Sequence, residues 1–379
     1  MIFMAANRNK HGSSIRPAIG NYGRIELAFT GAPCVDIQQF TQKLSSAITL
    51  DLAVAYVDAS HDQNDPDAYL DAGITSVITK HESRVTQINK EGFNRLNPKI
   101  DLLEFDLTLL NGNHFEGKHQ VVFLDSRKTD SLMRNRGKLT DVLCFVDVDA
   151  NGKIPTFLGK EYEDLPVFNS NQLDAIVAHL EKWIIPQRPK LNGLVLAGGK
   201  SLRMGEDKGS LKYHQKPQRE HVADLLKGFC DEVFISIAQD QQIKSSYPTY
   251  ADLFIDMGPL GAILTAFRNQ PDSAWLVIAC DIPMADASSI EDLIKQRSKS
   301  SMATAYQKSI NDLPEPLFAI WEPKIYGRSL QQLSMGIQCP RKLLINSPIH
   351  TVIPSDSSIL VNANSQDERN EVLRIIQNV

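Results

Sequence analysis

The chain has 379 residues, which is long enough for two domains of ordinary size. Hydrophobic residues make up 42% of the chain and charged residues 22%, so each half can bury a core of its own. The formal net charge of −5 argues against a nucleic-acid-binding protein with a broad basic face, and no apolar run approaches the ~20 residues that a membrane span needs.

The first half of the chain has the pattern of an α/β domain. Residues 1–24 are polar and weakly patterned, and we expect a flexible N-terminal segment there. An α/β domain is expected over 25–185, and a helix with apolar residues at helical spacing over 169–184 closes it. Two prolines then predict a linker at 186–191. The expected strands of this half are 25–31, 52–60, 75–80, 99–112, 119–126 and 142–148.

The second half, 192–379, alternates strands and helices again, which predicts a second α/β domain. The expected strands are 193–197, 232–238, 251–256, 274–281, 302–307, 316–321, 350–354 and 359–362, and the expected helices are 219–229, 260–270, 289–298 and 367–378. Such alternation indicates a Rossmann-like fold, with a mostly parallel mixed sheet and helices on both faces.

The stretch LVLAGGKSLRMGEDK, residues 194–208, carries the strongest chemical signal. Gly198 and Gly199 allow a sharp turn and let backbone N–H groups approach an anion closely. Arg203 can bind phosphate oxygens with two parallel hydrogen bonds, and Lys208 adds a mobile positive charge. Neither the Walker loop nor the dinucleotide fingerprint has this order of residues.

This stretch resembles the signature of nucleotidyltransferases, specifically the molybdenum cofactor guanylyltransferases of the MobA family. The resemblance extends over about 191–379, where IDMGPLGAI, ACDIP, EPLFAIW and VNANSQDE follow in the family's order. It implies transfer of the GMP part of GTP to molybdopterin with release of pyrophosphate, in a Mg²⁺-dependent reaction. It also implies a nucleotide site that includes Leu196, Ala197, Gly198 and Gly199.

Asp281 is the leading candidate for the Mg²⁺ ligand. It ends an apolar strand, where a carboxylate is costly unless it is hydrogen-bonded, paired or bound to a metal. A helix cap before Pro283 is the alternative. The expected catalytic residues are therefore Arg203, Lys208 and Asp281.

The resemblance also implies a base side and an acceptor side. Asp256 is expected to contact the nucleotide, with a plain turn aspartate as the alternative, and Ser236 stands where the family has a guanine-side asparagine. Asn362 and Asn364 point to one side of an extended segment and are expected near the metal or the pterin, although asparagines are also common in turns.

Several departures from the family pattern concern the base and the acceptor more than phosphate transfer. Only one residue separates Asp256 from Gly258, Ala262 replaces a glycine, and Ser365-Gln366 replaces Thr-Pro. The remaining alternatives are therefore CTP instead of GTP, a sugar phosphate as acceptor, or a non-catalytic cofactor-binding or scaffold protein.

The N-terminal half weakly resembles MobB, a GTP-binding partner protein of the guanylyltransferases, with an emptied nucleotide loop. Counted from Gly31, a Walker loop needs Gly, Lys and Ser or Thr at 36–38, where the chain has Asp36, Ile37 and Gln38. Phosphate binding by this half is therefore poorly supported.

The remaining expectations concern compartment and partners. Five scattered cysteines without Cys-x-x-Cys spacing predict reduced, buried thiols in a cytoplasmic protein. His214 and His221 flank a helix start and are expected at the surface. GTP and molybdopterin are the expected small-molecule partners, with molybdoenzymes or other cofactor-assembly proteins as possible macromolecular ones, and no nucleic acid or membrane.

Overall fold

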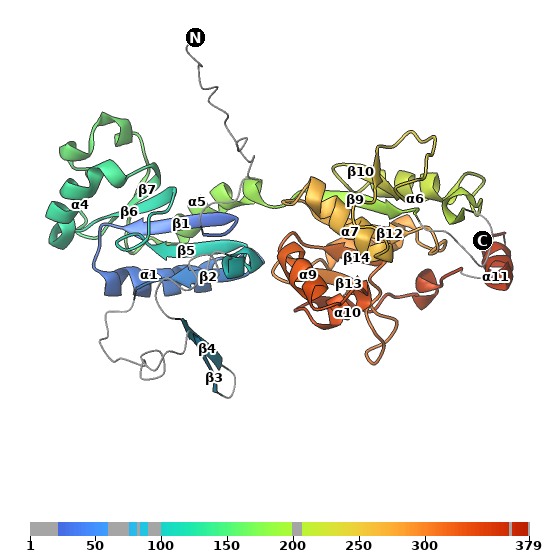
Figure 1. The fold of residues 1–379 in the computed structure, drawn as a ribbon. Helices are drawn as coiled ribbons and strands as arrows, with labels where there is room; N and C mark the ends of the chain where they lie inside the picture. The colour runs from blue at the N-terminus through green and yellow to red at the C-terminus, as the bar shows by residue number, and fades with distance from the viewer. Residues whose placement is uncertain are drawn as a thin grey trace, which may run out of the picture.

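The computed structural model describes residues 22–59, 76–81, 84–89, 100–198, 207–363 and 366–377. They form two α/β domains that lie next to each other, and the chain passes from one to the other just after helix α5 (Figure 1). The predicted α/β class with helices on both faces of the sheets is confirmed.

The N-terminal domain is built on a six-stranded sheet with the order β2-β5-β1-β6-β7-β8, and all of its strand pairs are parallel. The strands are β1 (Ile25–Thr30), β2 (Val54–Val57), β5 (Leu107–Asn111), β6 (His119–Leu124), β7 (Asp141–Asp147) and β8 (Val167–Asn169). A separate antiparallel hairpin pairs β3 (Ser76–His81) with β4 (Arg84–Asn89).

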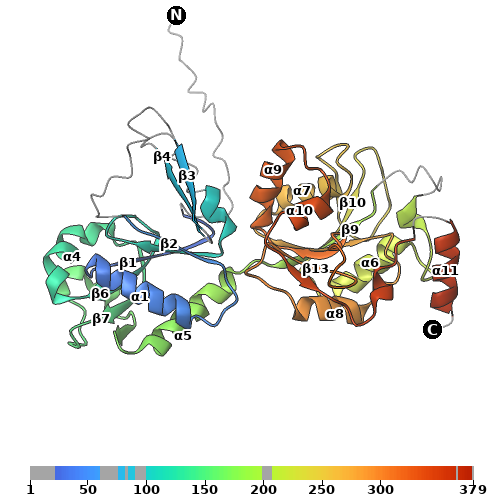
Figure 2. The same ribbon diagram turned by 90° about the horizontal axis from the view of Figure 1, so that it is seen from below.

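Helices cover both faces of this sheet because its strands are apolar on both sides. Helices α1 (Cys34–Ala47) and α5 (Leu173–Ile184) pack on one face, and Figure 2 shows them side by side there. The short α4 (Thr129–Asn135) packs on the other face through Leu132.

The C-terminal domain has a seven-stranded mixed sheet with the order β11-β10-β9-β12-β14-β13-β15. Only β14 runs antiparallel to its neighbours. The strands are β9 (Leu191–Leu196), β10 (Val233–Ile237), β11 (Thr249–Ala251), β12 (Ala274–Ala279), β13 (Ala303–Tyr306), β14 (Phe318–Trp321) and β15 (His350–Val352).

Two helical layers enclose this sheet (Figure 2). Helices α6 (Gln218–Lys227) and α8 (Ala287–Lys295) pack on one face, and α8 begins at a capping box formed by Asp286 and Ser289. The helices of the other face are α7 (Gly258–Asn269), α9 (Ile325–Ser334) and α10 (Pro340–Ile345). The last helix, α11 (Gln366–Gln377), packs through Val372 beside Tyr213.

The two sheets face each other with their amino edges. Arg24 directly precedes β1 and pairs with Asp272, which lies just before β12. Asp106 directly precedes β5 and pairs with Lys324, which lies just after the antiparallel β14. The carboxyl edges, where open α/β sheets bind ligands, therefore point away from the domain junction in both domains.

The structure corrects several expected elements. Residues 251–256 are not a strand, because β11 ends at Ala251, and the expected strand 359–362 is mainly a 3₁₀ turn, Ser357–Leu360. Helices α9 and α10 were not expected from the sequence. The expected flexible segment 1–24 extends too far, because Arg24 is buried at the junction with a side chain 13% exposed.

The expectation of five buried cysteines is also only partly right. Cys144 and Cys280 are buried, Cys34 and Cys230 are partly exposed, and Cys339 is exposed.

Candidate functional site

The candidate site lies where the central strand β9 ends at the carboxyl edge of the C-terminal sheet. Ala197 N donates to Ser236 O of β10 at 3.1 Å, and Cys280 N, following β12, donates to Leu196 O at 3.1 Å. The chain goes from β9 to β10 on one side and later to β12 on the other. This is a topological switch point, the place where open α/β sheets form a ligand crevice.

Gly198 is required at this edge because there is no room for a side chain. A Cβ atom built on Gly198 would lie 2.9 Å from Ala238 N and 3.1 Å from Ile237 C, and both are backbone atoms that cannot rotate away. The backbone of Gly198, the first glycine of the motif, therefore packs directly against the end of β10.

Three of the other expected phosphate-binding groups lie outside what the structure describes. These are Gly199, Arg203 and the side chain of Lys208. The backbone of Lys208 begins a 3₁₀ turn, Lys208–Ser210, directly after the loop. Leu196 and Ala197 are buried at the end of β9.

Asp207, the aspartate that directly precedes Lys208 in the motif, is bonded through both of its carboxylate oxygens. Its Oδ1 accepts a hydrogen bond from Gly209 N at 3.0 Å, and its Oδ2 lies 2.6 Å from Arg219 Nη1 of helix α6. Arg219 has a side chain only 12% exposed, so this ion pair is well shielded. The ion pair fixes Asp207, which directly precedes Lys208, to α6, the first helix of the C-terminal domain.

Asp281 and Asn362 lie next to each other through the backbone. Ala363 N donates to Asp281 O at 2.9 Å, so the C-terminal segment runs along the loop that follows β12. The Oδ1 atom of Asn362 is buried and has no hydrogen-bond partner in the described part of the chain. Asn364 lies outside the described residues.

These two side chains fit a hard divalent cation. Mg²⁺ takes oxygen ligands and is usually held by one or two protein groups together with phosphate oxygens and water. Asp281 carries a carboxylate, and Asn362, whose backbone adjoins the loop of Asp281, carries an amide oxygen that is buried and without a hydrogen-bond partner among the described residues. Among the described residues, no cluster of three or more His, Cys, Asp or Glu side chains offers a complete protein cage instead.

Asp252, rather than Asp256, contacts Ser236. Ser236 Oγ donates to Asp252 Oδ1 at 2.6 Å, and burial raises the pKa of the Asp252 carboxyl although this hydrogen bond opposes the shift. Asp256 lies in the turn before α7 with φ of +60°, a left-handed conformation that is uncommon outside glycine. No signal in the sequence marked Asp252, because 251–256 was expected to be one strand that contains it.

His214 and His221 link two walls of the site and are less exposed than expected. Their rings stack with centroids 3.8 Å apart, and His214 Nε2 lies 3.0 Å from Pro283 O in the loop that carries Asp281. Burial, together with His214 and Lys216, lowers the pKa of His221 to about 4, so this ring is neutral at pH 7.

The corresponding edge of the N-terminal domain is acidic. Gly31, after β1, has φ of +89°, and a Cβ atom there would lie 2.3 Å from Phe123 O. Asp36, at the first of the three positions where a Walker loop needs Gly, Lys and Ser or Thr, forms an ion pair with Arg127, which also pairs with the buried Asp125. Arg127 is therefore paired with two carboxylates at this edge.

The mixed, mostly parallel sheet and the close backbone approach of Gly198 at a switch point define an α/β protein with the geometry of a ligand crevice at this edge. The model of the MobA-like NTP transferase domain matches residues 193–350. A molybdenum cofactor guanylyltransferase of Xanthomonas euvesicatoria is 30% identical over 48% of this chain and 93% of its own. The chain therefore belongs to the MobA-like NTP transferase family.

Other similarities extend less far. A molybdenum cofactor biosynthesis bifunctional protein of Synechocystis is 32% identical over 50% of this chain, and the match spans only 55% of that protein. A solved structure of molybdopterin-guanine biosynthesis protein B is 14% identical over 42% of this chain, with a TM-score of 0.31. That likeness is too low to carry an argument, and the resemblance of the N-terminal half to MobB stays a prediction.

The described part of the chain contains no helix that is both long enough and apolar enough to cross a membrane.

Proposed function

We propose that the C-terminal domain transfers the GMP moiety of GTP to molybdopterin and releases pyrophosphate. The N-terminal domain would serve as a fused adaptor without a nucleotide site of its own. Family membership supports the reaction class, and the acidic edge of the N-terminal sheet supports the second part.

One observation carries the proposal more than any other. The hydrogen bond from Ala363 N to Asp281 O holds the segment of Asn362, which we assign to the acceptor side, against the loop that carries Asp281 after β12. Gly198 follows β9, the strand that pairs with β12, and Cys280 N donates to Leu196 O between the ends of these two strands. These two contacts support the proposal that phosphate binding, metal binding and acceptor binding share one edge of the sheet.

In the proposed reaction, a phosphate oxygen of molybdopterin attacks the α-phosphorus of GTP, and the bond to the β-phosphate breaks. The attacking oxygen is already anionic, so no strong general base is needed. Lys208, Arg203 and the backbone N–H groups of the glycine turn would align the triphosphate and stabilise the charge on the departing pyrophosphate.

Asp281 and Asn362 would hold Mg²⁺, which supplies charge neutralisation on the phosphate oxygens when bound. Ser236 and Asp252 lie at the ends of the neighbouring β10 and β11, and we assign them to the base side of the nucleotide. Asp256, in the turn before α7, is assigned only a secondary part in nucleotide binding.

The test is pyrophosphate release by the purified full chain, scored over the four nucleoside triphosphates with and without molybdopterin. We expect release that needs molybdopterin, Mg²⁺ and GTP. Release with CTP only, or with a sugar phosphate as the only effective acceptor, would select the corresponding alternative. No release with any combination would favour a cofactor-binding scaffold.

Two variants with matched controls test the assigned residues. Lys208→Ala and Asp281→Asn should each lower turnover by about 100- to 1,000-fold, the usual cost of one transition-state contact. Lys212→Ala and Asp312→Asn change exposed residues of the same types and should leave turnover unchanged. Wild-type turnover in Lys208→Ala, in a protein with an unchanged unfolding midpoint, excludes its phosphate role.

The setting of this reaction is also a proposal. We expect a cytoplasmic enzyme that passes its product to a molybdoenzyme or to another cofactor-assembly protein. Binding of the purified chain to such a protein, measured with and without GTP and molybdopterin, would test this step.

A further inference from the structure

A cavity of about 80 Å³ lies between the two domains, away from both carboxyl edges. Six charged side chains from both domains and from the linker line it: Arg24, Asp106, Arg188, Asp272, Lys299 and Glu322. The volume is several times the ~10–15 Å³ that one water molecule needs, but it is far too small for a nucleotide.

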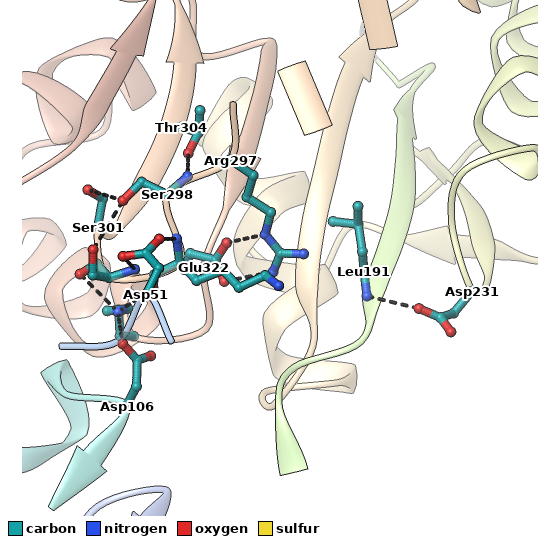
Figure 3. A network of polar contacts seen from close by, with 12 residues as sticks. Asp51, Asp106, Leu191, Asp231, Arg297, Ser298, Ser301, Thr304 and Glu322 are labelled. Carbon is teal, nitrogen blue, oxygen red and sulfur yellow. Dashed lines mark hydrogen bonds and ion pairs between the residues drawn. The ribbon is translucent and has the colours of Figure 1, made fainter. Parts of the chain in front are cut away.

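Each of the three carboxylates at this cavity already has a cationic partner. Arg24 pairs with Asp272, and Lys324 Nζ lies 2.5 Å from Asp106 Oδ2. Arg297 donates two hydrogen bonds to Glu322, at 2.6 and 2.9 Å (Figure 3).

Arg188 and Lys299 are the cations that remain. Neither forms a side-chain ion pair within the described parts of the chain, and the Nε and Nη2 atoms of Arg188 are buried without a hydrogen-bond partner there. Buried polar atoms are rarely left in this state, because an unmade hydrogen bond to a charged group is costly.

The electrostatic field at Lys299 agrees with this count of charges. Burial lowers the pKa of the Lys299 ammonium, and the nearby Arg188 and Arg297 lower it further, against Glu322 and Asp51. The backbone around Lys299 is held in place at the same time, because Lys299 N donates to Asp51 Oδ2 at 2.6 Å and Lys324 Nζ donates to Lys299 O at 2.7 Å. Figure 3 shows Asp51 and Asp106 reaching this part of the C-terminal domain.

We propose that the interdomain cavity binds a small free oxyanion of the phosphate class between Arg188 of the linker and Lys299 of the C-terminal domain. A planar guanidinium suits two oxygens of such an anion, and the ammonium adds a second positive charge. The bound anion would neutralise both cations and tie the linker to the domain junction. This inference does not depend on the nucleotidyl transfer proposed above, because the cavity lies at the amino edges of the sheets.

The test measures binding and stability on the full chain with inorganic phosphate as the probe. Isothermal titration calorimetry and thermal unfolding compare sodium phosphate with sodium chloride at equal ionic strength. We expect saturable binding of one phosphate per chain and a Tm that rises with phosphate but not with chloride. GMP serves as the probe for a nucleotide phosphate. Because the cavity is expected to take only a free anion, any change in Tm that GMP causes should be the same in the wild type and in Arg188→Gln.

Arg188→Gln and Lys299→Gln should each weaken phosphate binding by about 10- to 100-fold, the usual worth of a charge-assisted contact. Lys190→Gln, an exposed neighbour in the linker, should bind as the wild type does. Without phosphate, Arg188→Gln should unfold at the same temperature as the wild type or higher, because it removes an unpaired buried cation. The proposal is overturned if chloride acts as phosphate does, or if phosphate stabilises the wild type and Arg188→Gln equally.

Discussion

Lys324 offers the sharpest test of what holds the two domains together. Its side chain is 1% exposed, and its ammonium donates to Asp106 Oδ2 at 2.5 Å, to Lys299 O at 2.7 Å and to Ser300 O at 3.1 Å. All three protons of the ammonium are therefore used, and one of the acceptors belongs to the other domain.

Lys324→Met removes the charge but keeps most of the side-chain volume. It leaves Asp106, whose side chain is 12% exposed, with the hydrogen bond from Ala53 N at 2.7 Å as its remaining close contact, and it leaves the carbonyls of Lys299 and Ser300 without this donor. Breaking a buried pair by removing one partner costs about 3–5 kcal/mol. We therefore expect the free energy of unfolding to fall by about that amount.

Lys295→Met is the matched control. Lys295 pairs with Glu291 on the surface of α8, with side chains 68% and 55% exposed, and such a pair contributes at most about 0.5 kcal/mol. The double variant Asp106→Asn/Lys324→Met should recover most of the loss, because neither charge then stays buried alone and the introduced amide oxygen can still accept from Ala53 N.

The assay is urea unfolding followed by tryptophan fluorescence and far-UV circular dichroism, since two domains can unfold in separate transitions. We expect the transition that includes the domain junction to move to lower urea in Lys324→Met and not in Lys295→Met. Equal stability of these two variants, or a double variant no more stable than Lys324→Met, would refute the assignment of a buried, charge-dependent contact.

Three further predictions follow from single residues. Gly198→Ala should lower turnover at least about 10-fold with little change in the buried core, because its Cβ would press on Ala238 N at 2.9 Å and displace the glycine turn; unchanged steady-state kinetics would contradict this. The pKa of His221 is about 4 when folded and its ordinary value is 6.5, so the unfolded chain binds a proton first, and stability should fall as the pH drops from 6.5 towards 4. His221→Asn should flatten that part of a Tm-against-pH profile, and an unchanged slope would count against it. Iodoacetamide should modify Cys34 well before Cys144. Burial raises the pKa of the Cys34 thiol, but hydrogen bonds from neighbouring side chains lower that pKa overall. Burial alone raises the pKa of Cys144 to about 12, so its thiol is the less reactive one. Mass spectrometry of the labelled peptides gives the order, and equal rates would be the contrary result.

Much of the architecture could be predicted from local pattern. The apolar runs that became β1, β6, β7, β9, β10 and β12 are buried on both faces, and such runs bounded by glycine or proline are typical of parallel strands. Helix α5 follows directly from its spacing of apolar residues. Short or polar elements were missed, among them α9 and α10, since their apolar residues are few and their packing against α7 decides that they are helical.

The candidate site divides in the same way. The glycine motif and Asp281 could be singled out as candidates because each combines a residue type with a place at the end of an apolar run. Asp252 was missed, because only the pairing of β10 with β11 brings it to Ser236. Asn362 could be suspected from the family resemblance, but its place beside the backbone of Asp281 rests on a hydrogen bond between segments about eighty residues apart.

The sequence by itself determined the kind of chemistry this chain can carry, because the glycines, cations and carboxylate of the motif are local features with local consequences. The tertiary structure alone decided that the two sheets meet amino edge to amino edge, that both carboxyl edges point outward, and that Arg188 and Lys299 line one interdomain cavity. These features depend on contacts between residues far apart in the chain. The pattern of residues within one segment does not indicate which distant residue will pair with a given charged side chain.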